Sequence, residues 1–243
     1  MGLIFHNLVY QPIYNLIIAF YNTVSFHDFG IAIILVTIVI KAILVPLSKK
    51  QIESQKKMQE MQPKIKAIQS KYKDDKEKQT KAVMNFYKEN KINPFSGCLP
   101  LIVQLIFLIA FYRIIINISS ANLVVNGEEL YSFVSRPDKI NHLFIGLVDL
   151  TKPSIFIAAL AAISQYFQTK MMLDKSESEK KEKDAKEDNG EPDFAQIMSK
   201  QMMYLGPILT LVIGIKFAAG LALYWLVQAL FSVFQQIYIF KKK

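Results

Sequence analysis

The chain has 243 residues, is 52% hydrophobic and carries 29 Lys and Arg against 20 Asp and Glu, a formal net charge of +9. Its apolar residues lie in long blocks and its charges in separate blocks, which is typical of membrane spans joined by aqueous loops and excludes an ordinary soluble domain. The lysines gather beside the apolar blocks without a nucleic-acid recognition motif, so we expect them to face an anionic membrane surface and to bind no specific nucleic-acid sequence.

The first apolar stretch, residues 3–24, is interrupted by polar side chains and by Pro12. Four polar residues recur at helical spacing and form one stripe: Asn7, Gln11, Asn15 and Asn22. Because a proline breaks or kinks a single span, we favour an extracytoplasmic segment over residues 1–27 that contains an interfacial amphipathic helix. The stretch is long enough for a transmembrane helix, which stays the alternative.

Five later blocks are apolar enough to cross a bilayer, and polar segments separate them. The predicted spans are residues 28–48, 95–116, 153–172, 199–215 and 217–240. The predicted connections are a cytosolic hairpin at 49–93, an extracytoplasmic loop at 117–152, a charged cytosolic loop at 173–197 and a cytosolic tail at 241–243.

The segment after the first span is basic and has a helical repeat. By direct count, residues 48–93 hold 13 Lys against 6 Asp and Glu. Apolar residues at spacings of three and four predict the seam of an antiparallel coiled-coil hairpin: Met58, Met61, Ile65, Ile68 and Tyr72. Asp74 with Glu77 resembles a capping box that starts the second helix.

The distribution of basic residues predicts the orientation. No Lys or Arg precedes the first span, whereas the segments after the first, third and fifth spans hold most of them. The positive-inside rule therefore places the N-terminus outside and the hairpin, the charged loop and the C-terminus in the cytosol.

Lys41 lies inside the first span. An ionisable side chain there costs about 2.5–3.5 kcal/mol on insertion scales, so it requires an explanation. Either it snorkels to the cytosolic surface, or it lines a water-filled cavity open to the cytosol. Gln104 in the second span and Gln168 in the third are also hard to bury in lipid, and they favour a shared polar cleft. Gln235 and Gln236, near the end of the fifth span, are expected to be interfacial.

The sequence contains no phosphate-binding glycine loop, no metal-ligand cluster in a span and no nucleophile paired with a base. We therefore expect no catalytic residue, no metal and no cofactor, and we do not expect an enzyme. His6, His27 and His142 are isolated and near the predicted outer face.

Four segments combine in a specific order and spacing. They are GIAIILVTIVIKAILVPLSKKQ at 30–51, MQEMQPKIKAIQSKY at 58–72, FYKENKINPFSGCLPLIVQLIFLIAFY at 86–112 and GLALYWLVQALFSVFQQ at 220–236. With the Asn-Pro-x-x-Gly-Cys-Leu-Pro entry to the second span, they resemble the YidC-type membrane protein insertases and their Oxa and Alb relatives, in the compact form of Gram-positive-like bacteria.

The resemblance implies an all-α membrane protein in which five transmembrane helices enclose a hydrophilic groove open to the cytosol. It places the family's basic groove residue, usually Arg, on Lys41, the polar position of the third span on Gln168, and the aromatic position of the fifth on Trp225, with Tyr224 beside it. With Gln104, these are the predicted substrate-groove residues. Ala218 departs from the family pattern, because Pro is usual there.

The function implied is insertion and folding of nascent membrane proteins in a bacterial plasma membrane, without nucleotide hydrolysis. The implied partners are the nascent chains and the bilayer, with the hairpin as the candidate contact for the ribosome, the signal-recognition machinery and the Sec translocon. Two alternatives stay open: a small transporter or channel, which predicts polar groups through the full bilayer, and a structural scaffold for membrane complexes.

Overall fold

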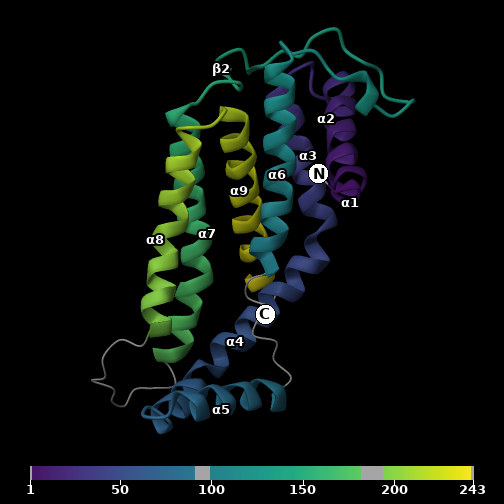
Figure 1. Ribbon diagram of the computed structural model, residues 1–243. Coiled ribbons are helices and arrows are strands. Elements are labelled where there is room, and N and C mark those ends of the chain that lie inside the picture. Colours follow the sequence, from purple (N-terminus) through teal and green to yellow (C-terminus); the bar gives the residue numbers. More distant parts are fainter. Residues whose placement is uncertain (1, 91–98, 182–193, 242–243) are drawn as a thin grey trace.

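The computed structural model describes residues 2–90, 99–181 and 194–241 (Figure 1). The entry to the second predicted span at 91–98, the middle of the predicted charged loop at 182–193 and residues 242–243 lie outside the described part. Within it, the chain is mostly helical, and the main exception is the connection at 121–154.

The N-terminal helix consists of α1 (Leu3–Phe5), a π-helical turn η1 (His6–Tyr10) and α2 (Gln11–Thr23). The other helices are α3 (Phe29–Ile43), α4 (Val45–Lys71), α5 (Lys76–Glu89), α6 (Leu99–Ser120), α7 (Ile155–Lys181), α8 (Phe194–Gly214) and α9 (Ala219–Lys241). Between α6 and α7 lie a 3-10 turn η3 (Gly127–Glu129) and the antiparallel strands β1 (Leu143–Phe144) and β2 (Val148–Asp149).

The long helices form a bundle with two distinct ends (Figure 1). We call the end that carries the 121–154 connection the loop end, and the end that carries α4 and α5 the hairpin end. Helix α7 packs most extensively against α8 and α9, α9 also packs on α3, and α3 packs on α2. Helix α9 therefore joins the α7–α8 pair to the N-terminal helices.

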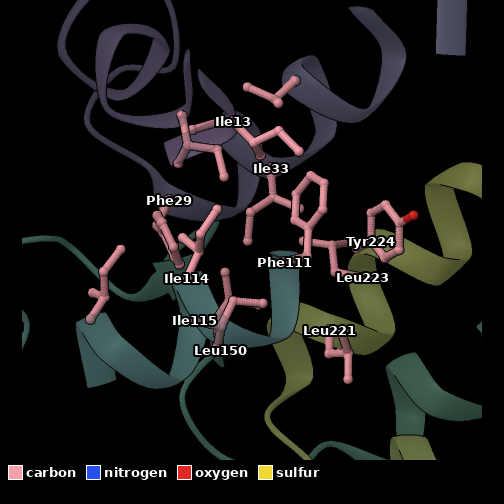
Figure 2. Close-up of a cluster of buried hydrophobic side chains, with 14 of the residues drawn as sticks. Ile13, Phe29, Ile33, Phe111, Ile114, Ile115, Leu150, Leu221, Leu223 and Tyr224 are labelled. Carbon is pink, nitrogen blue, oxygen red and sulfur yellow. The ribbon is translucent and has the colours of Figure 1, made fainter. Parts of the chain in front are cut away.

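The apolar core lies toward the loop end. Its fully buried side chains come from α2, α3 and the second half of α6: Ile17, Ile18, Ile33, Phe111 and Ile114. Figure 2 shows Phe111 beside Tyr224 of α9, and the two rings stack with centroids 4.2 Å apart. Because lipid tails are as apolar as these side chains, close van der Waals packing holds this end together.

The N-terminal helix runs through Pro12 without a break, contrary to our expectation. In a regular α-helix the proline ring clashes with the preceding turn. Here the preceding turn is π-helical and therefore wider, which makes room for the ring. The polar stripe docks a loop and does not simply face the membrane surface. Asn15 Nδ2 donates to the Glu129 carbonyl at 2.8 Å, and Asn15 Oδ1 accepts from the Tyr131 amide at 2.6 Å.

The structure supports an all-α, multi-pass membrane protein. Three helical segments are long and apolar enough to cross a bilayer, Leu3–Thr23, Ile102–Ser120 and Ala219–Tyr238, and a fourth qualifies if the bent pair α3–α4 counts as one span. The N-terminal helix thus meets the length and composition criterion for a span, which was our alternative to an interfacial helix. Gln165, Gln168 and Lys170 lower the mean hydropathy of α7, and the apolar part of α8 is short, Met203–Gly214.

Two local details differ from the sequence analysis. The predicted first span, residues 28–48, bends by 60° between α3 and α4. Pro46 stands in the first turn of α4, where its missing amide costs no helical hydrogen bond, so a new helix direction starts there. The N-cap of α5 is Asp75, whose carboxylate accepts from the Lys78 amide at 3.0 Å, and not Asp74 as we predicted. That hydrogen bond helps lower the pKa of Asp75.

Candidate functional site

Lys41 lies in the last turn of α3 and points to α9. Its ammonium donates a hydrogen bond to the Ser232 hydroxyl at 3.3 Å, and the side chain is half-buried. A charged group at this depth is usually turned toward protein or water and away from lipid, because lipid supplies no partner. Lys41 is therefore part of the contact between α3 and α9.

Buried polar side chains continue along α9 from Gln228 onward. Gln228, Ser232 and Gln235 are spaced by four and three residues, so they share one face of the helix, and all three are buried. Gln235 Nε2 donates to Ser48 Oγ of α4 at 3.0 Å. We call this set the polar seam; its members are Lys41, Ser48, Gln228, Ser232, Gln235 and Gln236.

The seam corrects our expectation for Gln235 and Gln236. Both were expected at the membrane interface, but both side chains are buried within the protein. Gln236 Oε1 and Gln51 Nε2 are buried without a hydrogen-bond partner in the described structure. A buried polar atom without a partner costs about 1–3 kcal/mol, so the hairpin end of the bundle holds hydrogen-bonding capacity that its own side chains do not use.

Tyr224 belongs to the apolar core, and Gln104 of α6 lies beside it. The Gln104 side chain is within hydrogen-bonding reach of the Tyr224 hydroxyl. The ring of Tyr224 stacks on the ring of Phe111. Trp225 is buried in the apolar core beside it. The structure thus brings Gln104 and Tyr224 together, with Trp225 as the next residue along α9.

Gln168 is half-buried on α7, and no hydrogen bond within the described residues joins it to the polar seam. Its neighbour one turn earlier makes the interhelical contact instead. Gln165 Oε1 accepts from Thr210 Oγ1 of α8 at 2.6 Å. This hydrogen bond ties α7 to α8, which lie side by side in the bundle (Figure 1).

Ser48 and Gln51 are residues that the sequence analysis missed, because we assigned them to the cytosolic connection or its border. Lys41 and Ser48 are seven residues apart, and in a regular helix this spacing places two side chains on one face. That periodicity, followed past the first charged residues, would have identified Ser48. Nothing in the sequence distinguishes Gln51 from its polar neighbours.

The chemistry available in the polar seam is that of one cation with hydroxyl and amide groups. Among the described residues, no group of three or more His, Cys, Asp or Glu side chains is placed to hold a metal ion. The seam can attract a carboxylate and can replace water around a polar chain by hydrogen bonding. The seam therefore has the groups needed to bind a polar segment.

Residues 19–243 match the family model described as 60Kd inner membrane protein. The membrane protein insertase YidC of Fusobacterium nucleatum is 35% identical over 236 residues, which are 95% of this chain and 98% of that protein. YidC 1 of Lactococcus lactis is 34% identical over 91% of this chain and 73% of its own length. The YidC of Pelobacter propionicus is 30% identical over 96% of this chain but only 39% of its own length. The matches include all the helices that form the polar seam.

Proposed function

The chain belongs to the YidC family of membrane protein insertases, and from this premise we propose that it inserts nascent membrane proteins into a bacterial plasma membrane. In this proposal the polar seam belongs to a hydrophilic groove that receives the extracytoplasmic tail of the substrate from the cytosol. The process uses no nucleotide. Five spans, from 28–48 to 217–240, enclose the groove, with the N-terminus outside and the hairpin in the cytosol.

The observation that carries the proposal is the contrast along the bundle. Toward the loop end, apolar side chains such as Phe111 and Ile114 fill the interior, whereas toward the hairpin end Lys41, Ser232 and Gln235 occupy it. A polar tail that enters at the hairpin end finds hydrogen-bonding groups for part of its path. The remaining dry path is shorter than a full bilayer of about 30 Å.

The energetics of transfer favour this arrangement. An Asp at the centre of a span costs about 2.5–3.5 kcal/mol on insertion scales, and the ammonium of Lys41 offsets part of that cost for an acidic tail. After transfer, the apolar span of the substrate moves into lipid, which contributes about 25 cal/mol per Å² of apolar surface. Burial of the substrate span therefore supplies the driving force.

The decisive test compares Lys41→Ala with Lys41→Arg in vesicles that contain only the purified protein. We expect the alanine variant to insert a single-span substrate with an acidic tail at least about fivefold more slowly, which corresponds to about 1 kcal/mol. The arginine variant should keep most of the activity, because it retains the charge. A substrate with a neutral tail is the control and should respond little. Unchanged insertion of the acidic substrate by Lys41→Ala would contradict the proposed role of the charge.

Membership of the other residues in the groove is testable by site-specific photo-crosslinking. Probes at Gln104, Gln168 and Trp225 should each capture a stalled nascent chain, and Ile208, exposed on α8, is the matched control that faces away from the interior. Capture at Ile208 as strong as at Trp225 would show that chains contact the bundle without entering a groove.

The α4–α5 hairpin is our proposed contact for the ribosome, the signal-recognition machinery or the Sec translocon. Most of the described lysine side chains in α4 and α5 are exposed, so they present positive charge beyond the hairpin end of the bundle. Such charge would favour negatively charged partners at the membrane surface, and binding should weaken as salt increases.

A further inference from the structure

An apolar tip projects at the loop end of the bundle. It consists of Phe26 from the α2–α3 turn, which is 90% exposed, and of Ile145 and Leu147 from the β1–β2 turn, which are 63% and 85% exposed. The segment 143–148, which contains the β1–β2 turn, has no charged side chain. Clustered exposed apolar side chains of this size mark a binding surface more often than a surface that faces water.

The tip is held in place and is not a loose loop. Asp28 caps α3 through Oδ1, which accepts from the Gly30 amide at 2.8 Å, and its Oδ2 accepts from the Ile145 amide at 2.7 Å. The Phe144 side chain packs so closely on Gly30 that a Cβ there would collide with it. One carboxylate therefore fixes the β1–β2 turn to the start of α3.

The backbone of both turns is strained in a way that exposes these side chains. Phe26 has a φ of 54°, His27 of 59° and Ile145 of 51°, all in the left-handed region that favours glycine. A β-branched residue such as Ile145 is especially unusual there. Strain of this kind persists only where the surrounding structure enforces it, and it concentrates at functional sites.

The length of α3 sets the depth of the tip. The 15 residues of α3 extend about 22 Å at 1.5 Å per residue, and the apolar residues 45–47 continue at an angle of 60° before Lys49 and Lys50. This apolar path is several ångströms shorter than a hydrocarbon core of about 30 Å. With the two lysines at one membrane surface, Phe29 falls short of the opposite surface, and the neighbouring tip lies at the level of lipid.

We propose that the apolar tip of Phe26, Ile145 and Leu147 inserts into the boundary between headgroups and acyl chains in the leaflet at the loop end, and thereby anchors α3 at a fixed depth. The partner is a lipid surface, because the short apolar path of α3 leaves the tip at the level of lipid and the tip's own three side chains are uncharged. Apolar side chains at this boundary are typically buried by about 5–10 Å. The proposal extends beyond the insertion activity and does not depend on it.

Depth measurement with a nitroxide spin label tests the proposal. The label is attached at Leu147→Cys in a chain whose only native cysteine, Cys98, is replaced by Ser, and the full chain is reconstituted in vesicles of phosphatidylethanolamine and phosphatidylglycerol. Two matched sites provide the scale: Glu128→Cys, exposed at the same end, and Ile208→Cys, exposed on α8. All three side chains are exposed, so the label disturbs no buried contact.

We expect the label at Leu147 to collide more often with oxygen than with a water-soluble nickel chelate, as at Ile208. Replacement of Phe26 by Asp should shift the Leu147 label toward the accessibility of Glu128, whereas Phe26→Leu should not. If the label at Leu147 has the same accessibility as the label at Glu128 in vesicles without any other protein, the lipid anchor is overturned. The apolar tip would then be a surface for a protein partner. That result would leave the proposed insertion activity untouched, because the activity is tested separately.

Discussion

Residues 219–227 and 228–238 of α9, which we call its first and second halves, present opposite chemistry to their neighbours, and the first half is the more buried. The first half contributes Leu221, Leu223 and Tyr224 to the apolar core, and the second half contributes Gln228 and Gln235 to the polar seam. Helix α9 as a whole packs against α7 and α3. The chemistry of its buried side chains therefore changes along one continuous helix.

This comparison shows how one helix can close a bundle at one end and leave it polar at the other. In lipid, apolar side chains gain little from burial except close packing, so the first half must fit its neighbours tightly. Polar side chains in lipid need partners, so the second half depends on hydrogen bonds to Lys41 and Ser48. Substitutions in the two halves should have different consequences for stability.

The largest effect is expected in the packed half. Phe111→Ala removes the ring that stacks on Tyr224 and leaves a cavity in a fully buried position. We expect a loss of about 3 kcal/mol in the free energy of unfolding, measured by reversible denaturation in detergent micelles.

The matched control for this prediction is Ile109→Ala on the same helix. Ile109 is exposed, so its truncation leaves no internal cavity and should change stability by less than about 1 kcal/mol. Equal losses at Phe111 and Ile109 would mean that the loop end is not held together by packing.

The second prediction is a gain in the free energy of unfolding. Gln236→Leu removes a buried carbonyl oxygen that has no partner among the described residues, so we expect the unfolding free energy to rise by about 1 kcal/mol. Gln235→Leu, the adjacent residue, breaks the hydrogen bond to Ser48 and should lower stability by a similar amount. The same denaturation assay compares both. If the two substitutions shift stability in the same direction, hydrogen bonding of these amides does not determine the stability of the second half of α9.

The smallest effect is expected away from α9, at the hydrogen bond that joins Thr210 of α8 to Gln165 of α7. Thr210→Val removes the hydroxyl that donates to Gln165, and interhelical hydrogen bonds in membranes average about 0.6 kcal/mol. A double-mutant cycle with Gln165→Leu measures the coupling between the two residues. A coupling near zero would indicate that the hydrogen bond does not stabilise the α7–α8 pair.

The sequence predicts the helices well because apolar blocks and their periodicity are local signals. It predicts less well what each polar residue contacts. Gln11 and Asn15 form a stripe that we interpreted as the polar face of an interfacial helix, but they bind the backbone at Glu129, more than a hundred residues away. The same stripe is compatible with water or with a docked loop, and only the tertiary structure distinguishes them.

Details that depend on backbone conformation were also beyond reach. Asp74 and Asp75 are equally suitable caps by composition, and the extended conformation of Asp75 decides between them. At the candidate site, Lys41 was conspicuous as a charge in an apolar block. Its contact with Ser232 joins residues 191 positions apart, so no local pattern reveals it.

The bend at Leu44 lies at one end of the long helix α4, so a change in the bend angle displaces the far end most. Helix α4 has 27 residues and is about 40 Å long, and the bend joins it to the end of α3. A tilt of about 10° there would carry the far end of α4, and α5 with it, through about 7 Å, by the same rise per residue. Ser48 lies only four residues from the bend and would move by about 1 Å, which a hydrogen bond to Gln235 tolerates. A small change in the bend at Leu44 would therefore displace the hairpin by several ångströms while the contact between Ser48 and Gln235 changes little.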